Sequence, residues 1–106
     1  MAAYDLYGST SQALDDIRSS VEKALGVTFE ARESSYQGGD YYRYGPAAGE
    51  HFVLKSNVDP YDGEPAETRF PQYPTLLYVN STSRSAELRG RVEALTELTL
   101  LRHEDF

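Results

Sequence analysis

The same succession of secondary-structure signals occurs twice in this chain: a short apolar strand, a Ser-Thr-Ser turn, an amphipathic helix and a second strand. The first occurrence begins at Leu6 and runs LYGSTS, and the second begins at Tyr78 and runs YVNSTS. The helical residues after the two turns do not align, so the chain repeats an architecture without an internal duplication. Helices that alternate with strands bury their apolar faces against a sheet, and we expect both strand–helix–strand connections to be right-handed crossovers.

Apolar residues at helical spacing predict one helix in each unit. The apolar face of the first helix consists of Leu14, Ile17, Val21 and Leu25, and that of the second consists of Leu88, Val92 and Leu95. Ser9 and Gln12 fit a capping box, in which a hydroxyl and an amide bond free N–H groups at the start of a helix. Asp15 and Asp16 then lie near the positive end of the helix dipole. Gly26 is expected to end this helix.

Alternating or short apolar runs predict strands at residues 3–7, 27–33, 40–44, 50–56, 75–80 and 96–103. The run 75–80 is apolar on both faces and is expected at the centre of the sheet. We therefore predict one α+β domain, residues 1–106, with a single mixed β-sheet of about six strands and two helices packed on one face. The expected element order is β-α-β-β-β-β-α-β, a ferredoxin-like arrangement with added strands.

A proline-rich acidic loop is predicted at about residues 57–74. This segment holds four of the five prolines, and proline removes backbone donors and fixes φ, so regular structure is not expected there. A loop of this length within one domain is often functional. The loop is too short to link two domains comfortably, so we expect one domain.

Several kinds of chemistry lack the residues that they need. The chain has no Cys, which excludes disulfides, thiolate catalysis and Cys-ligated metals. The two histidines lack metal-ligand spacing: His51 is expected to be a cross-strand residue and His103 to lie in a solvated polar tail at 103–106. The acidic run DPYDGE, residues 59–64, lacks the ligand order of a calcium loop. Without a nucleophile elbow or phosphate loop, we expect no enzyme, no metal and no cofactor.

We expect the protein to be cytoplasmic. The first residues, MAAYDLYG, lack the basic segment and apolar stretch of a signal peptide. The apolar runs are only a few residues long, which is far short of a membrane span.

Negative charge and tyrosine gather in the same part of the chain. The formal net charge is −7, and residues 1–68 carry 12 acidic and 5 basic side chains against 5 of each in residues 69–106. Residues 32–45, RESSYQGGDYYRYG, combine a Gly-Gly turn with four of the nine tyrosines. These tyrosines could be ordinary strand residues or interface residues. An acidic field favours basic partners and opposes nucleic acid.

This profile resembles bacterial immunity proteins, the toxin-neutralising cytosolic inhibitors, and the stretches DYYRY and DPYDGEPAE carry the resemblance. The resemblance implies a non-enzymatic acidic protein that covers the basic active-site surface of a cognate toxin, often a nuclease, in a one-to-one complex. It requires no membrane and no nucleic acid. The expected partner-binding residues are Tyr36, Asp40, Tyr41, Tyr42, Tyr44, Asp59, Tyr61, Asp62, Glu64 and Glu67.

The alternative is a small regulatory or ligand-binding α+β domain. Its pocket would lie between the sheet and the helices and would be lined by tyrosine. Such a domain could form a homodimer through an edge of the sheet, where unpaired backbone groups are available to another chain.

Overall fold

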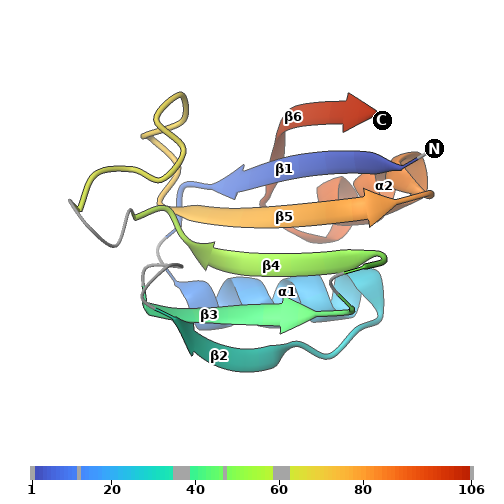
Figure 1. Cartoon of the computed structure of the whole chain (residues 1–106), viewed down its shortest axis with the longest axis horizontal. Helices are drawn as coiled ribbons and strands as arrows, with labels where there is room; N and C mark the ends of the chain where they lie inside the picture. The colour runs from blue at the N-terminus through green and yellow to red at the C-terminus, as the bar shows by residue number, and fades with distance from the viewer. Residues whose placement is uncertain (1, 12, 35–38, 47, 59–62, 106) are drawn as a thin grey trace.

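Six strands form one open sheet in the computed structural model, and both helices lie on the same face of it (Figure 1). The structure describes residues 2–11, 13–34, 39–46, 48–58 and 63–105. In chain order the elements are β1 (Ala3–Ser9), α1 (Leu14–Leu25), β2 (Glu30–Ser34), β3 (Gly39–Tyr44), β4 (His51–Ser56), β5 (Thr75–Thr82), α2 (Ser85–Leu95) and β6 (Thr99–Asp105). The predicted α+β class and element order are confirmed.

The order of the strands in the sheet is β2-β3-β4-β5-β1-β6, and every neighbouring pair is antiparallel. The prediction of a mixed sheet is therefore wrong. The reason is the position of β1: β5 and β6 run in the same direction, as a crossover requires, but β1 lies between them. Without β2 and β3, the remaining order β4-β5-β1-β6 is that of a ferredoxin-like sheet, to which β2 and β3 add one edge.

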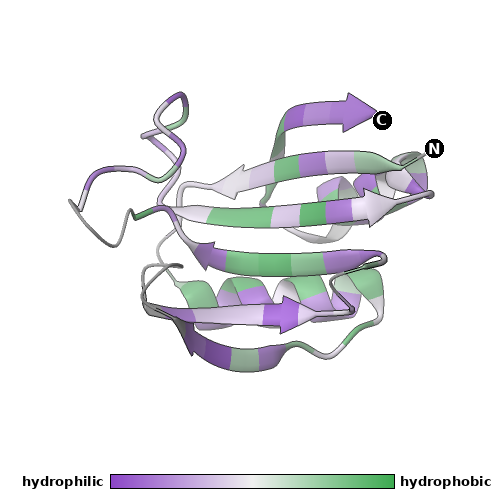
Figure 2. Ribbon diagram, viewed as in Figure 1, coloured by the Kyte–Doolittle hydropathy of each residue, from purple (hydrophilic) through white to green (hydrophobic). Residues whose placement is uncertain are grey.

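The hydrophobic core fills the space between the sheet and the two helices. It consists of Tyr7, Ile17, Val21, Ala24, Leu25, Phe29, Phe52, Leu54, Leu77, Val79, Leu88, Val92 and Leu98. Apolar residues gather in β4 and β5, while β2 and the far end of β6 are hydrophilic (Figure 2). The central position predicted for residues 75–80 is confirmed, since β5 lies between β4 and β1. A strand in that position buries both of its faces, which explains its apolar composition.

Several apolar side chains are also buried on the opposite, open face of the sheet. Leu6, Val53 and Leu76 are at most 7% exposed and do not belong to the core cluster. The described part of the proline-rich loop folds against this face. Glu67 accepts a hydrogen bond from the Tyr78 hydroxyl at 2.7 Å. This loop thus gives the sheet a second, smaller buried layer.

Asn57 organises the described part of that loop, which contains no helix or strand. Its side-chain N–H group donates to the carbonyls of Phe70 and Tyr73 at 3.1 and 2.9 Å. Its side-chain oxygen accepts the N–H of Glu67 at 2.8 Å, and its own backbone N–H donates to the carbonyl of Pro74 at 2.8 Å. Asn57 is 6% exposed, so these bonds are shielded from water. One buried amide therefore replaces the regular hydrogen bonding that proline prevents.

The start of α1 differs from the predicted capping box. The helix begins at Leu14, and no side chain caps it. Ser9 instead belongs to β1, where it pairs with Thr75 and its hydroxyl donates to Glu97 at 3.1 Å. Gln12 lies outside the described residues. The prediction for the other end is confirmed, because Gly26 adopts a left-handed conformation with φ of 67°.

Several predicted strand bounds differ from the observed ones: the last strand begins at Thr99 and not at residue 96, and two further differences have a clear physical cause. The strand predicted at 27–33 begins at Glu30, because the N–H of Phe29 bonds to the Glu22 carboxylate at 2.7 Å and holds the connection against α1. The polar tail predicted at 103–106 is part of β6 through Asp105, and His103 pairs with Asp5 of β1. In the first place a hydrogen bond to the preceding helix decides the boundary, and in the second a strand pairing distant in sequence does.

We expect Asn57→Ala to lower the free energy of unfolding by about 2–4 kcal/mol, because it removes three side-chain hydrogen bonds and leaves buried backbone groups unpaired. Urea denaturation followed by circular dichroism measures this change. Gln72→Ala, at an exposed position of the same loop, serves as the control and should change stability by less than about 0.5 kcal/mol. Equal stability of the two variants would show that Asn57 does not organise the loop.

Candidate functional site

The tyrosines predicted to form one binding surface lie on opposite faces of the sheet. Tyr42 packs against the hydrophobic core, and the ring of Tyr44 stacks on Phe52 at 5.5 Å between centroids, so both face the helices. Tyr41 is opposite Lys55 in β4 and faces the other way. Side chains alternate between faces along a strand. The two side chains thus point to different faces, although both line a hollow at the β2–β3 edge together with Asp40.

The acidic residues predicted in the proline-rich loop also serve different purposes. Glu67 accepts from Tyr78 and pairs with Arg102 at 3.4 Å, which gives it a structural role. Glu64 is exposed. Tyr36, Asp59, Tyr61 and Asp62 lie outside the described residues.

A first groove lies between the start of α1 and strand β3. Its volume is about 480 Å³, and it is lined by Ala13, Leu14, Asp15, Asp16, Asp40 and Tyr42. The three aspartates are exposed. The sequence assigned only Asp40 and Tyr42 to a site, because Asp15 and Asp16 had a sufficient explanation in the helix dipole. The adjacency of α1 and β3, which the sequence does not reveal, brings these carboxylates together.

Tyr42 is held in this groove by two contacts. Its hydroxyl donates to Asp15, and the Arg18 guanidinium lies 5.2 Å from the centre of its ring. The hydrogen bond to Asp15 raises the pKa of the Tyr42 hydroxyl. Arg18 is itself paired with Glu22 at 3.1 Å. The Tyr42 ring is thus fixed as a wall of the groove.

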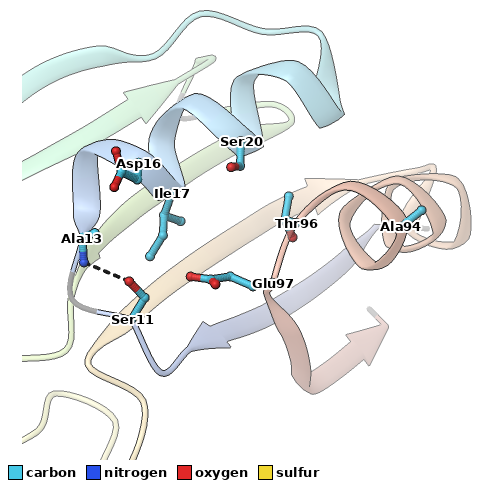
Figure 3. Close-up of a pocket in the computed structure, with 8 residues that line it drawn as sticks. All are labelled: Ser11, Ala13, Asp16, Ile17, Ser20, Ala94, Thr96 and Glu97. Carbon is cyan, nitrogen blue, oxygen red and sulfur yellow. Dashed lines mark hydrogen bonds between the residues drawn. The ribbon is translucent and has the colours of Figure 1, made fainter.

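A second groove, between α1 and the segment that follows α2, continues from the first (Figure 3). It has a volume of about 540 Å³ and is lined by Ser11, Ala13, Asp16, Ile17, Ser20, Ala94, Thr96 and Glu97. Asp16 lines both grooves. Asp40, Asp15, Asp16 and Glu97 therefore form one acidic strip over the helix side of the molecule. No sequence signal pointed to Glu97, since its position depends on the pairing of β1 with β6.

The acidic strip provides carboxylates and hydroxyls but no convergent catalytic arrangement. Within the described ranges, no three His, Asp or Glu side chains come close enough together to hold a metal ion. Ile17 and Ala94 add apolar surface to the second groove. Carboxylates and hydroxyls beside a small apolar surface suit a side chain that has an aliphatic stem and a cationic head, as Lys and Arg have.

A separate polar cluster joins β1, α2 and β6 through Asp5, Ser85 and His103. Its three residue types are those of a catalytic triad, but the connections differ. The Ser85 hydroxyl donates to Asp5 and also lies 3.4 Å from Nδ1 of His103, the ring nitrogen that contacts Asp5. Nε2 of His103 lies 3.1 Å from Asp105. Both ring nitrogens are thus engaged by carboxylates, whereas a triad needs one of them as the base for the hydroxyl. The cluster instead satisfies the carboxylate of Asp5, which is 2% exposed.

His51 occupies the cross-strand position that the sequence predicts. It lies opposite Asn80 in β5, and its Nε2 is 3.2 Å from the side-chain nitrogen of Asn80. Its Nδ1 lies 2.8 Å from the carbonyl oxygen of Gly49. Both ring nitrogens thus have partners in the sheet and the preceding turn.

We expect the stability of the protein to fall as the pH rises through the pKa of His103. Hydrogen bonds to Asp5 and Asp105 raise this pKa above the ordinary value of 6.5. The folded chain then holds a proton that the unfolded chain releases, so the stabilisation is complete below about pH 6.5 and is lost above the folded pKa. Urea denaturation across this pH range measures the effect. In the His103→Gln variant this decrease in stability with rising pH should be absent. If the variant shows the same decrease as the wild type, other groups are responsible for it.

Tyr42→Phe should lower the free energy of unfolding by about 0.5–1.5 kcal/mol, because it removes the hydrogen bond to Asp15. Tyr41→Phe is the matched control on the other face of the same strand and should change stability by less than about 0.5 kcal/mol. Thermal and urea denaturation of both variants test the assignment. A larger loss of stability for Tyr41→Phe than for Tyr42→Phe would contradict the assignment of the stabilising hydrogen bond to Tyr42.

No helix among the described residues is long and apolar enough to cross a membrane. Comparison of the sequence with protein-family models gives no match, and comparison with curated proteins finds no similar sequence.

Proposed function

We propose that this chain is a non-enzymatic binding protein that acts as an immunity protein in the cytoplasm. It neutralises a cognate bacterial toxin by covering the basic active-site surface of the toxin in a one-to-one complex. The observation that carries the proposal is the acidic strip of Asp40, Asp15, Asp16 and Glu97, whose members line two grooves that share Asp16. The resemblance of the sequence to immunity proteins points to the same function.

The geometry of the second groove suits an arginine or lysine of the partner. Asp16 and Glu97 offer carboxylates from the two walls, while Ile17 contacts the aliphatic stem. Charge-assisted hydrogen bonds between a guanidinium and a carboxylate are among the strongest available to proteins. The net charge of −7 steers a basic toxin toward the strip and accelerates association.

The structure changes the set of residues that we propose for the complex. Asp40 and Tyr42 stay in the set, and Asp15, Asp16 and Glu97 join it. Tyr41 faces the opposite side of the sheet, and Glu67 is held by Tyr78 and Arg102. Tyr44, Glu64 and the four residues outside the described ranges stay as candidates for the margin of the interface.

Nothing specific favours a ligand-binding domain with a tyrosine-lined pocket between the sheet and the helices. The space in which that pocket was expected holds Tyr7, Phe52 and Leu77, each 0% exposed. The grooves lie on the outside of α1 instead.

The test uses the toxin encoded beside the gene of this chain, since immunity and toxin genes are expected to be neighbours. The wild-type chain should bind the toxin in a one-to-one complex by isothermal titration calorimetry and should protect cells that express it. The triple variant D16N/D40N/E97Q removes three charges of the strip without changing side-chain size. We expect its affinity to fall about tenfold or more, through slower association in the weaker field and faster dissociation after loss of the charge-assisted hydrogen bonds.

The matched control is E87Q/E93Q/E104Q, which removes three charges outside the two grooves. Its affinity should stay within about threefold of the wild-type value, because rim and distant charges contribute little. Equal weakening by both triple variants would show that net charge alone is responsible and that the strip is not the site. Failure of the wild-type chain to bind or neutralise the neighbouring toxin would overturn the proposed function.

A further inference from the structure

Strand β2 forms an open edge of the sheet (Figure 1). It pairs with β3 on one side only, over five residues in regular register from Glu30 opposite Arg43 to Ser34 opposite Gly39. Residues 30–33 are all exposed. An edge strand of this kind presents a row of backbone N–H and C=O groups that another strand can complete.

The other edge of the sheet, β6, carries two features that oppose such pairing. Its register with β1 shifts between Leu6 and Tyr7, which marks an irregularity in the strand. The Arg102 side chain is engaged by Glu67 at 3.4 Å and by Glu104 at 3.1 Å. Bulges and charged groups are the usual means by which proteins protect an edge. The β2 edge has no such bulge, so only its charged side chains determine which strand can pair with it.

The charges of β2 are complementary to those of a second copy of the same strand. If two copies pair antiparallel around a two-fold axis through Ala31, Glu30 of each copy lies opposite Arg32 of the other. Opposite charges at directly facing positions stabilise a strand pair, and like charges destabilise it. Glu30 and Arg32 share the open face of the sheet and contact each other at 3.0 Å within one chain. In the paired strands they would form an alternating row of four charges.

We propose that two copies of this chain associate through β2 to form one continuous antiparallel sheet centred on Ala31. The small side chain of Ala31 lies at the two-fold axis and permits the close approach of the two strands. The interaction uses Glu30, Ala31 and Arg32, none of which lines either groove of the acidic strip. Ala31 lies opposite Tyr42 of the first groove, whereas no residue of the second groove belongs to β2 or β3. The homodimer therefore borders the first groove and leaves the second groove open on each copy.

Sedimentation equilibrium over micromolar to millimolar protein concentrations tests the proposal. The wild-type chain should show a dimer whose fraction rises with concentration. Glu30→Arg and Arg32→Glu each place like charges opposite each other at both facing positions. The dimer affinity of each variant alone should therefore be at least about tenfold lower than that of the wild type. Both positions are exposed, and circular dichroism checks that the variants stay folded.

Mixing the two variants supplies the decisive measurement. The Glu30→Arg copy has two bases at the edge and the Arg32→Glu copy has two acids, so an equal mixture should recover dimerisation as a heterodimer. Such recovery would show that positions 30 and 32 of one chain meet those of the other, since neither variant can restore the contact within its own chain. A wild-type chain that stays monomeric, or a mixture without heterodimer, would overturn the proposal. Dimers that neither variant weakens would place the contact elsewhere.

Discussion

The pairing of β1 with strands on both of its sides determines the rest of this structure. β1 comes from the start of the chain, yet its neighbours β5 and β6 begin at Thr75 and Thr99. Because β1 lies between them, the start of α1 is brought close to the segment that follows α2. Two hydrogen bonds between segments distant in sequence stabilise this junction: the Ser9 hydroxyl donates to Glu97, and the Thr75 hydroxyl donates to the carbonyl of Ser11 at 2.8 Å. The second groove exists because these segments meet.

A buried carboxylate fixes the opposite end of β1. Burial of an ionised group is costly unless the group is fully hydrogen-bonded. Asp5 meets this condition through Ser85 at the start of α2 and His103 in β6. These partners belong to two other elements, so a different register of β1 would leave the carboxylate buried without them. The arrangement therefore favours one register of β1 over its alternatives, which apolar packing alone distinguishes less sharply.

The sequence predicts the types and the order of the elements well, because hydrophobic periodicity is a local property. Leu14, Ile17, Val21 and Leu25 show a helix regardless of what they pack against. It does not predict which strands become neighbours, and the errors about the mixed sheet, the role of Ser9 and the polar tail follow from that. His103 resembles a residue of a polar tail until Asp5 is placed beside it.

The residues of the candidate site are even harder to predict from local sequence patterns. Tyr41 and Tyr42 are adjacent in sequence and were assigned to one surface, although alternation in a strand separates them. Asp15 and Asp16 have a complete local explanation at a helix N-terminus, which hides their proximity to Asp40. Glu97 has no local signal at all. Surface sites that combine distant segments depend on strand order, and sequence patterns carry least information about strand order.

The two proposed surfaces use charge in different ways. The acidic strip has one sign, so it attracts a basic partner over a distance, and salt weakens that attraction. The β2 edge alternates in sign, so its attraction acts only at contact, while two copies with a charge of −7 each repel one another at longer range. At physiological ionic strength the screening length is about 8 Å, which suppresses the long-range repulsion more than the contact pairs. Salt should therefore oppose the toxin complex and interfere far less with the homodimer. Under the two proposals, one acidic chain selects a basic partner on its helix side and its own copy at its sheet edge.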